Sequence, residues 1–147
     1  MTYKRILLAT DGSDHARRAA QEAVQLAQSL GAEVTVLSVA IVHPMYGGIH
    51  LGPAGAKALE EHAEHSAELA AEDTSSVLAQ KGVPAKAIAT VTHHGKPAEA
   101  ILKTAEEIGA DLIVMGSRGL GRASSVVMGS TSQGVIHEAS IPVLVVH

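Results

Sequence analysis

Residues 5–30 read RILLATDGSDHARRAAQEAVQLAQSL, and this stretch decides the fold. It opens with the five-residue run RILLA, which is too short for a helix and is typical of a buried strand. The turn Thr10-Asp11-Gly12-Ser13 follows, and apolar residues then recur at helical spacing as far as Leu30. Ser13 is the predicted N-cap, and Gly31 lies just beyond the predicted end of the helix. The stretch therefore predicts a strand, a tight turn and a helix.

The same alternation of strand and helix patterns continues to the end of the chain. Further strands are predicted over residues 34–39, 87–92, 111–115 and 141–146, and further helices over residues 54–81, 97–108 and 130–138. A segment rich in glycine and proline, residues 44–53, predicts a long loop without regular structure. Because this alternation implies crossover connections, we expect a single α/β domain over residues 1–147, with a doubly wound, Rossmann-like, five-stranded parallel sheet. Ligands of such sheets bind at the carboxyl ends of the strands.

The composition narrows the possible function classes. A chain of 147 residues with 46% apolar and 18% charged residues is expected to form one globular core. With no Phe, no Trp and only two Tyr, the chain has few of the aromatic side chains on which nucleic-acid bases stack. The net charge of −4 offers no attraction to nucleic acids or anionic membranes, so neither is an expected partner. The absence of cysteine excludes disulfides, thiolate metal sites and cysteine nucleophiles.

The opening segment MTYKRILLAT has the length of a strand and lacks the longer apolar region of a signal peptide. No apolar run in the sequence approaches the roughly 20 residues that span a bilayer. We therefore expect a cytoplasmic protein without direct membrane insertion.

Two glycine clusters follow the fourth predicted strand. The first contains Gly116 and Gly119, and the second, after nine intervening residues, opens the last predicted helix at Gly129. Glycine has no Cβ atom, so backbone amides at these positions can approach an oligophosphate closely. The amides and the dipole at a helix N-terminus also attract anions. Together the two clusters predict a site for a nucleoside triphosphate.

Polar side chains beside the glycines support this interpretation. Arg118 or Arg122 can add positive charge, and the hydroxyls of Ser130 and Thr131 are suited to contact phosphate oxygens or to help hold a hydrated magnesium ion. The order of the glycines matches neither a Walker A loop nor a dinucleotide fingerprint. Alternatively, the glycines serve only a tight turn and a helix start, but the presence of two clusters favours nucleotide binding.

The pattern Gly116-x2-Gly119-x9-Gly129-Ser130 resembles the ATP-binding signature of the universal stress protein family. The resemblance covers essentially the whole chain, including the opening RILLATDGSDHARRA, the segment GKPAE at residues 95–99, the motif DLIVMGSRGLG and the closing PVLVVH. It implies a single-domain, ATP-binding protein of the UspA type, with a fold of the adenine nucleotide alpha hydrolase-like class.

The resemblance also implies roles for residues outside the glycine clusters. Ala9, Thr10 and Asp11 are similar to the segment that lines the nucleoside, with the Asp11 carboxylate near the ribose or a metal. Val39 resembles the position whose backbone contacts adenine, and Met115, which borders the first cluster, belongs to the implied site although its side chain suits packing. Magnesium is expected to be held through the ATP phosphates. Asp11 has an alternative role, because in its Asp-Gly context it can brace the turn or cap the helix.

The nine histidines include His62 and His65, three residues apart, and the adjacent His93 and His94. The first pair lies among glutamates on the polar stripe of a predicted helix, so a solvent-exposed face is favoured over a zinc site. The second pair is predicted to end the third strand. We therefore expect no metal site made by protein side chains.

Two features near the C-terminus lead to separate expectations. The run Val143-Leu-Val-Val146 is apolar on both faces and ends the chain, so an edge strand is predicted that pairs with a second copy to form a homodimer. Gly134 lies inside the last predicted helix, where relatives commonly carry a larger residue, and it costs about 1 kcal/mol of helix propensity.

Three functions remain open from the sequence. The favoured one is a non-catalytic ATP-binding regulatory module, which the resemblance extends to the stress response and to regulation of a membrane solute transporter. The second is a slow ATPase or nucleotide-dependent transferase. For this function the sequence offers no evident general base and no Ser-His or Cys-His pair, and His15 is the candidate base to test. The third is a scaffold that binds no nucleotide, and the intact glycine signature argues against it.

Overall fold

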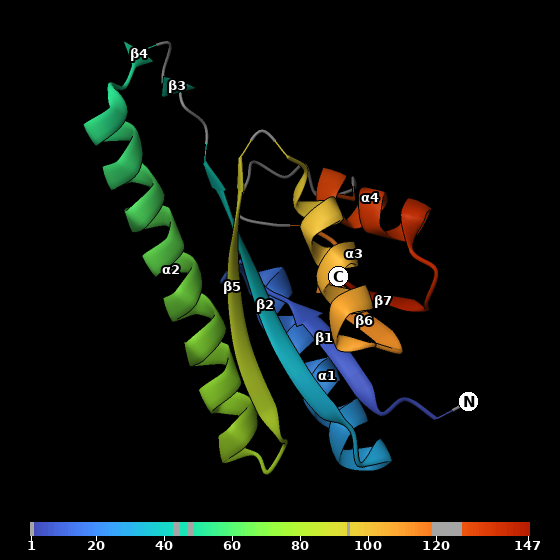
Figure 1. Ribbon diagram of the computed structural model, residues 1–147. Helices are drawn as coiled ribbons and strands as arrows, with labels where there is room; N and C mark the ends of the chain where they lie inside the picture. The colour runs from blue at the N-terminus through green and yellow to red at the C-terminus, as the bar shows by residue number, and fades with distance from the viewer. Residues whose placement is uncertain (1, 43–44, 47–48, 94, 119–127) are drawn as a thin grey trace.

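Five parallel strands form the central sheet, in the order β5-β2-β1-β6-β7 (Figure 1). The strands are β1 (Arg5–Ala9), β2 (Glu33–Val42), β5 (Ala85–His93), β6 (Leu112–Gly116) and β7 (Val143–Val146). The helices are α1 (Asp14–Leu30), α2 (Pro53–Gln80), α3 (Pro97–Ile108) and α4 (Ser130–Glu138). This computed structural model describes residues 2–42, 45–46, 49–93, 95–118 and 128–147. The predicted doubly wound α/β fold with a five-stranded parallel sheet is confirmed.

The segment predicted as a loop without regular structure contains a short antiparallel hairpin, and that prediction was wrong. Its strands are β3 (Met45–Tyr46) and β4 (Ile49–His50), which pair only with each other. The sequence signal was the pair Gly47-Gly48, because a two-residue glycine connection between short segments is typical of a hairpin. In Figure 1 the hairpin lies beyond the end of the central sheet, where the chain enters α2.

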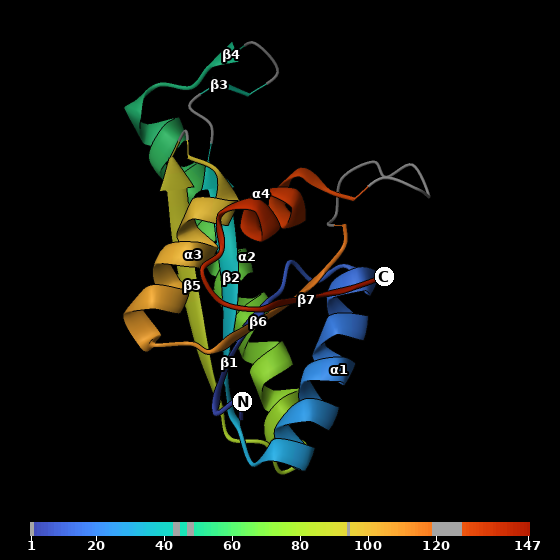
Figure 2. The ribbon, with the colours of Figure 1, turned by 90° about the vertical axis from the view of Figure 1, so that its right-hand side faces the viewer.

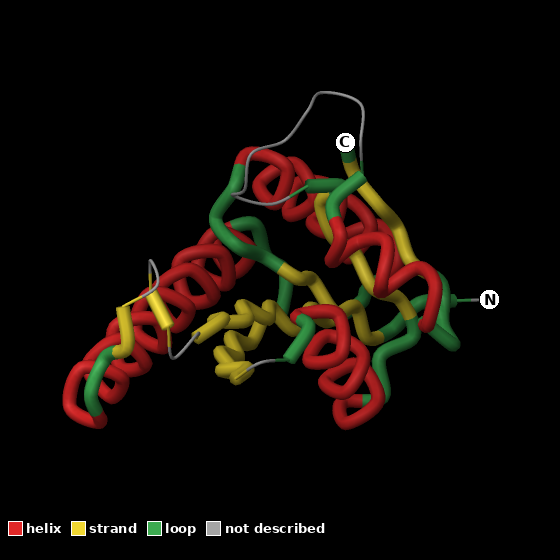
Figure 3. The backbone as a smooth tube through the Cα atoms, turned by 90° about the horizontal axis from the view of Figure 1, so that it is seen from above, coloured by secondary structure: helices red, strands yellow, loops and turns green. Residues whose placement is uncertain are grey.

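The sheet separates two apolar cores, because successive residues of a strand point to opposite faces. Ile6 and Leu8 of β1 pack against α1 and α2, whereas Leu7 packs against α3 and α4, and all three are fully buried. Seen from above in Figure 3, the strands run between the helices. Alanine and branched aliphatic residues fill both cores, as the near absence of aromatic residues requires.

Strand order determines where a ligand can bind. From β1 the chain adds β2 and then β5 on one side, and α3 carries it back across the sheet to β6 on the other side of β1. As a result α1 leaves β1 over one face, and α4 follows β6 over the opposite face (Figure 2). The carboxyl ends of β1 and β6 are therefore the switch point at which doubly wound sheets bind ligands.

Local signals determine the ends of α1. The Ser13 hydroxyl accepts a hydrogen bond from the Ala16 amide at 3.2 Å, and Gly31 closes the helix with a φ of 64°. Both caps agree with the sequence prediction.

Gly134 has a packing role that the sequence did not reveal. A Cβ atom at this position of α4 would lie 2.9 Å from the Cβ atom of Ala98 in α3. That separation is shorter than carbon atoms tolerate, so the glycine lets the two helices approach closely. The cost in helix propensity is therefore offset by close packing of α3 and α4.

We expect Gly134→Ala to lower the free energy of unfolding by about 1 kcal/mol, because overpacking outweighs the gain in helix propensity. Urea denaturation measures the change. Combining Gly134→Ala with Ala98→Gly removes the close contact, so in a double-mutant cycle the two changes together should cost less than the sum of their separate costs. A Gly134→Ala variant as stable as the parent would contradict the packing role.

Candidate functional site

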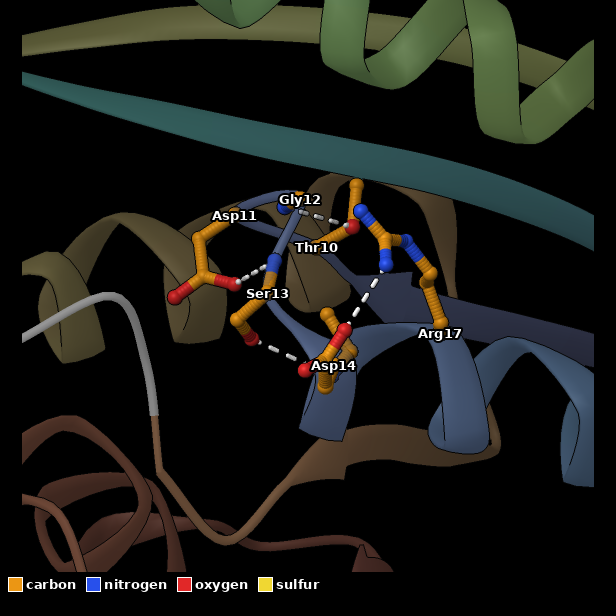
Figure 4. A network of polar contacts seen from close by, with 7 residues as sticks. Thr10, Asp11, Gly12, Ser13, Asp14 and Arg17 are labelled. Atoms are coloured by element: carbon orange, nitrogen blue, oxygen red, sulfur yellow. Dashed lines mark hydrogen bonds and ion pairs between the residues drawn. The ribbon is translucent and has the colours of Figure 1, made fainter. Parts of the chain in front are cut away.

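The turn after β1 is held by its own polar groups (Figure 4). The Asp11 carboxylate accepts a hydrogen bond from the Ser13 amide at 2.9 Å, and the Thr10 hydroxyl accepts one from the Gly12 amide at 3.3 Å. Gly12 adopts a φ of 79°, which favours glycine. The turn-bracing role that the sequence left open for Asp11 is thus present. The turn lies at the carboxyl end of β1, which contains the residues for which the resemblance implies contact with the nucleoside.

Ser117, the residue after β6, joins three elements. Its amide donates to the Val146 carbonyl at 2.8 Å, and its carbonyl accepts from the Gly129 amide at 2.7 Å. Its hydroxyl lies 3.1 Å from Nδ1 of His15 in the first turn of α1. One buried residue therefore ties β7, the start of α4 and the start of α1 to the end of β6.

Ser132 completes this junction from α4. Its hydroxyl is within 2.9 Å of the Ser117 carbonyl and 3.0 Å of the Gly129 carbonyl, and the residue is 1% exposed. Sequence reasoning missed both serines. The available signal was their position, since Ser132 lies in the first turn of the last helix and Ser117 lies inside the first glycine cluster.

Gly116 and Gly129, one glycine from each cluster, lie on either side of the Ser117 junction, and both also have a structural reason to be glycine. A Cβ atom at Gly116 would lie 2.8 Å from Cβ of His15, so α1 packs directly on this residue. A Cβ atom at Gly129 would lie 3.3 Å from the Ser117 carbonyl oxygen and 3.5 Å from Cα of Arg118. Packing against the protein therefore requires a small residue at Gly116 whether or not a ligand is present.

The first turn of α4 faces this junction. Gly129 is the N-cap, and the intrahelical ladder begins with the Gln133 amide bonded to the Gly129 carbonyl at 3.0 Å. Helix geometry leaves the preceding amides, those of residues 130–132, without intrahelical acceptors. Ser130 is exposed and Thr131 is half-buried, so both are accessible at this helix terminus.

Arg118 contacts α1 through its side chain. Its Nη2 lies 2.8 Å from Nε2 of His15. Because a guanidinium only donates, Nε2 is the acceptor, and the neutral imidazole carries its proton on Nδ1 and donates it to the Ser117 hydroxyl. Partial burial, followed by the positive charges of Arg118 and Arg18, lowers the pKa of His15.

The Ser117–His15 contact corrects the expectation that no Ser-His pair is present. It does not have the properties of a nucleophile and its general base. Ser117 is 2% exposed, and the group on the far nitrogen of His15 is a cation, whereas a catalytic histidine is oriented by a carboxylate. A cation at that position opposes the imidazolium that proton transfer would create.

The other predicted site residues are distributed around the same edge of the sheet. Ala9 and Val39 are half-buried at the carboxyl halves of β1 and β2, and Met115 is buried in the core beneath α3 and α4. The Met115 side chain therefore packs, as its apolar character suggested. Gly119 and the alternative cation Arg122 lie outside the described residues.

Among the residues that the structure describes, no group of three or more His, Cys, Asp or Glu side chains is arranged to hold a metal ion. His62 and His65 are exposed on α2, as predicted, and Nδ1 of His65 lies 4.0 Å from the Glu68 carboxylate. His93 ends β5, as predicted, and pairs with Glu60 of α2 at 3.1 Å. His94 is outside the described residues.

A cavity of about 480 Å³ opens at the opposite end of the sheet, beside Gly31 and Gly82. These glycines follow α1 and α2, and the C-terminal ends of helices carry partial negative charge. That end of the sheet is therefore less suited to phosphate than the N-terminus of α4. Within the described residues, no helix combines the length and apolar character needed to cross a bilayer.

Comparisons with known proteins agree on one family. A sequence model described as the Universal stress protein family matches residues 2–147. A universal stress protein of Thermus aquaticus is 44% identical over 144 residues, which cover 98% of each chain. The structure of UspA from Lactobacillus plantarum has a TM-score of 0.78 at 29% identity and covers 100% of this chain and 99% of its own.

A universal stress protein of Archaeoglobus fulgidus, solved in complex with dAMP, has a TM-score of 0.72 at 24% identity, with 100% of both chains covered. This likeness is one of fold. The match over residues 2–147 and the identity to the Thermus aquaticus protein establish that the chain belongs to the universal stress protein family.

Proposed function

We propose that this chain is an ATP-binding regulatory protein of the cytoplasm, which acts as a nucleotide-dependent module in the stress response. The observation that carries the proposal is the junction at Ser117, which brings the glycine-containing end of β6 against the N-terminus of α4. The braced turn after β1 lies at the same edge of the sheet. Proteins of this fold also bind nucleotides, as the Archaeoglobus fulgidus complex with dAMP illustrates.

The residues of this edge fit a nucleotide in their chemistry. The amides at the start of α4, which lack intrahelical acceptors, and the positive end of its dipole suit phosphate groups, with Arg118 as a nearby cation. The Ser130 and Thr131 hydroxyls are accessible for phosphate oxygens or for water around magnesium. The nucleoside would be lined by Ala9, Thr10 and Asp11, and the adenine base would contact the Val39 backbone. Met115 would support this site from the apolar core below it.

A membrane solute transporter is the protein partner that the resemblance suggests for such a module. Nucleotide occupancy of the junction between β6 and α4 would then change a surface that the partner recognises.

A slow ATPase or nucleotide-dependent transferase is the second candidate, because Ser117 and His15 are in contact. Burial of Ser117 and the cation beside His15 disfavour it, since neither a free nucleophile nor an unobstructed base results.

We expect Ser130→Glu to lower ATP affinity at least tenfold, which is about 1.4 kcal/mol, because a carboxylate at the helix N-terminus repels phosphate. The same charge favours the helix dipole, so the melting temperature should not fall. Calorimetric titration and thermal unfolding measure the two effects. The control Ser76→Glu places an equal charge on the exposed side of α2 and should leave affinity unchanged. Unchanged affinity in Ser130→Glu would exclude phosphate binding at this terminus.

We expect ATP turnover well below the 1–10³ s⁻¹ typical of enzymes, because the described part of the chain offers no positioned base or free nucleophile at the site. A single-turnover assay with magnesium should show bound ATP persisting for minutes. Turnover near one per second that is lost in His15→Ala would instead favour the enzyme.

A homodimer joined through β7 belongs to the same proposal, and the edge position of β7 supports it. The carbonyls of Pro142 and Val146 accept hydrogen bonds from Ile113 and Ser117, so these residues face β6. Because strand residues alternate, the amide of Val145 points away from β6 toward the open edge. It is therefore available for pairing with a second copy.

We expect Val145→Pro to convert a dimer to monomers, because proline removes an outward donor without touching the β6–β7 ladder. Light scattering at micromolar concentration reports the mass. Val145→Thr keeps the amide and the branched shape and should stay dimeric. A parent protein that is monomeric under these conditions rules out the β7 interface.

A further inference from the structure

The contact between Arg118 and His15 involves a residue of the predicted phosphate site and a titratable group outside it. The Arg118 guanidinium lies 2.8 Å from Nε2 of His15, which accepts only while the imidazole is neutral. Protonation of His15 would remove this acceptor and place two positive charges next to each other. The contact is therefore compatible with only one protonation state of His15.

The backbone of Arg118 borders the other side of the site. Its Cα atom lies 3.5 Å from the place that a Cβ atom of residue 129 would occupy, so it adjoins the first turn of α4. Its side chain instead extends to the first turn of α1. The long arginine side chain thus starts beside the predicted phosphate position and ends on a neutral acceptor. Phosphate is the stronger acceptor for a guanidinium, because charge-assisted hydrogen bonds are roughly twice as strong as neutral ones.

Several groups act on His15 besides its partial burial. The positive charges of Arg118 after β6 and Arg18 on α1 lower its pKa, electrostatic interaction with His147 after β7 also lowers it, and a hydrogen bond with the Val146 backbone raises it. The nearby Asp14 carboxylate is paired with Arg17 at 2.7 Å. Partial burial and these charges together lower the pKa of His15, which agrees with the neutral imidazole that the Arg118 contact requires. A bound phosphate would raise the pKa of His15, both through its own negative charge and because it would draw the Arg118 guanidinium away from the imidazole.

We propose that His15 and the phosphates of the nucleotide compete for Arg118, so that nucleotide binding is coupled to uptake of a proton by His15. The proposal rests on the nucleotide-binding function proposed above and adds a regulatory consequence, tighter binding at lower pH. The direction follows from linkage: a group whose pKa is raised by a ligand increases the affinity for that ligand as pH falls through the raised value. Each unit of pKa increase gives at most a tenfold gain in affinity.

The test measures binding of ATP with magnesium by calorimetry between pH 6.0 and 8.0, in buffers of different ionisation enthalpy. The wild-type protein should take up a fraction of a proton near neutral pH and bind at least threefold more tightly at pH 6.0 than at pH 8.0. His15→Gln keeps an acceptor for Arg118 and a donor for Ser117 but does not titrate, so it should bind ATP without the pH dependence that His15 contributes. Protonation of ATP itself contributes equally to both proteins and cancels in the comparison. His62→Gln, on the exposed face of α2, should behave as wild type.

A second measurement uses the unaltered chain. The nuclear magnetic resonance titration of His15, assigned by its loss in His15→Gln, should shift to higher pH when ATP is added. In Arg118→Gln without nucleotide, the same titration should move up toward the ordinary histidine value, and ATP should bind more weakly.

The outcomes separate the two proposals. ATP binding with the same pH profile in wild type and His15→Gln would overturn the coupling and leave nucleotide binding intact. No detectable ATP binding by wild type at any pH would overturn both. An ATP-independent His15 titration in a protein that binds ATP would also overturn the coupling.

Discussion

The peptide unit and side chain of Ser117 form the contact on which the rest of the site depends. Its amide extends the ladder to β7, its carbonyl holds the start of α4, and its hydroxyl meets His15 at the start of α1. In a parallel sheet each strand ends without a tight turn to its neighbour, so the loops at the carboxyl edge need contacts of this kind to hold them in place. Ser132 adds a second bond to the same carbonyl and is equally buried.

This junction explains why small residues gather around it. Gly116 is closely backed by His15, and Gly129 leaves little room beside the Ser117 carbonyl. The glycines thus combine two requirements, close packing of helices on the strand end and exposure of backbone amides at the start of α4. A site made of backbone groups needs a rigid junction, because rotation about side-chain bonds cannot change the direction of the amides or of the α4 dipole. The same residues that stabilise the edge of the sheet therefore shape the proposed nucleotide site.

Small residues also determine how the helices pack away from the site. Without Phe or Trp, the two cores are built from alanine and branched aliphatic residues, and helices come close to one another. The contact of Gly134 with Ala98 is the clearest example. A glycine at this position lowers the helix propensity of α4 but allows α3 and α4 to pack closely. Since α4 begins at the proposed phosphate position, its packing on α3 helps to orient the helix terminus that the phosphate would meet.

Most of the fold follows from signals between residues close in the chain. The RILLA strand, the Ser13 cap, the Gly31 ending and the bounds of α4 all appear where short-range periodicity and capping residues predict them. The parallel sheet follows from the alternation of strands and helices, and the glycine clusters indicate the switch point. Such features depend on neighbouring residues, whose backbone preferences act before any tertiary contact forms.

Tertiary structure alone decided which side chains meet at the site. His15 and Ser117 are separated by 102 positions, and their contact exists only because α1 packs over the end of β6. Tertiary packing also accounts for three further features. These are the contact of Arg118 with His15, the burial of Ser117 and Ser132, and the close approach of α3 and α4 at Gly134. No periodicity or local preference encodes these contacts, since they depend on strand order and on how closely two layers pack.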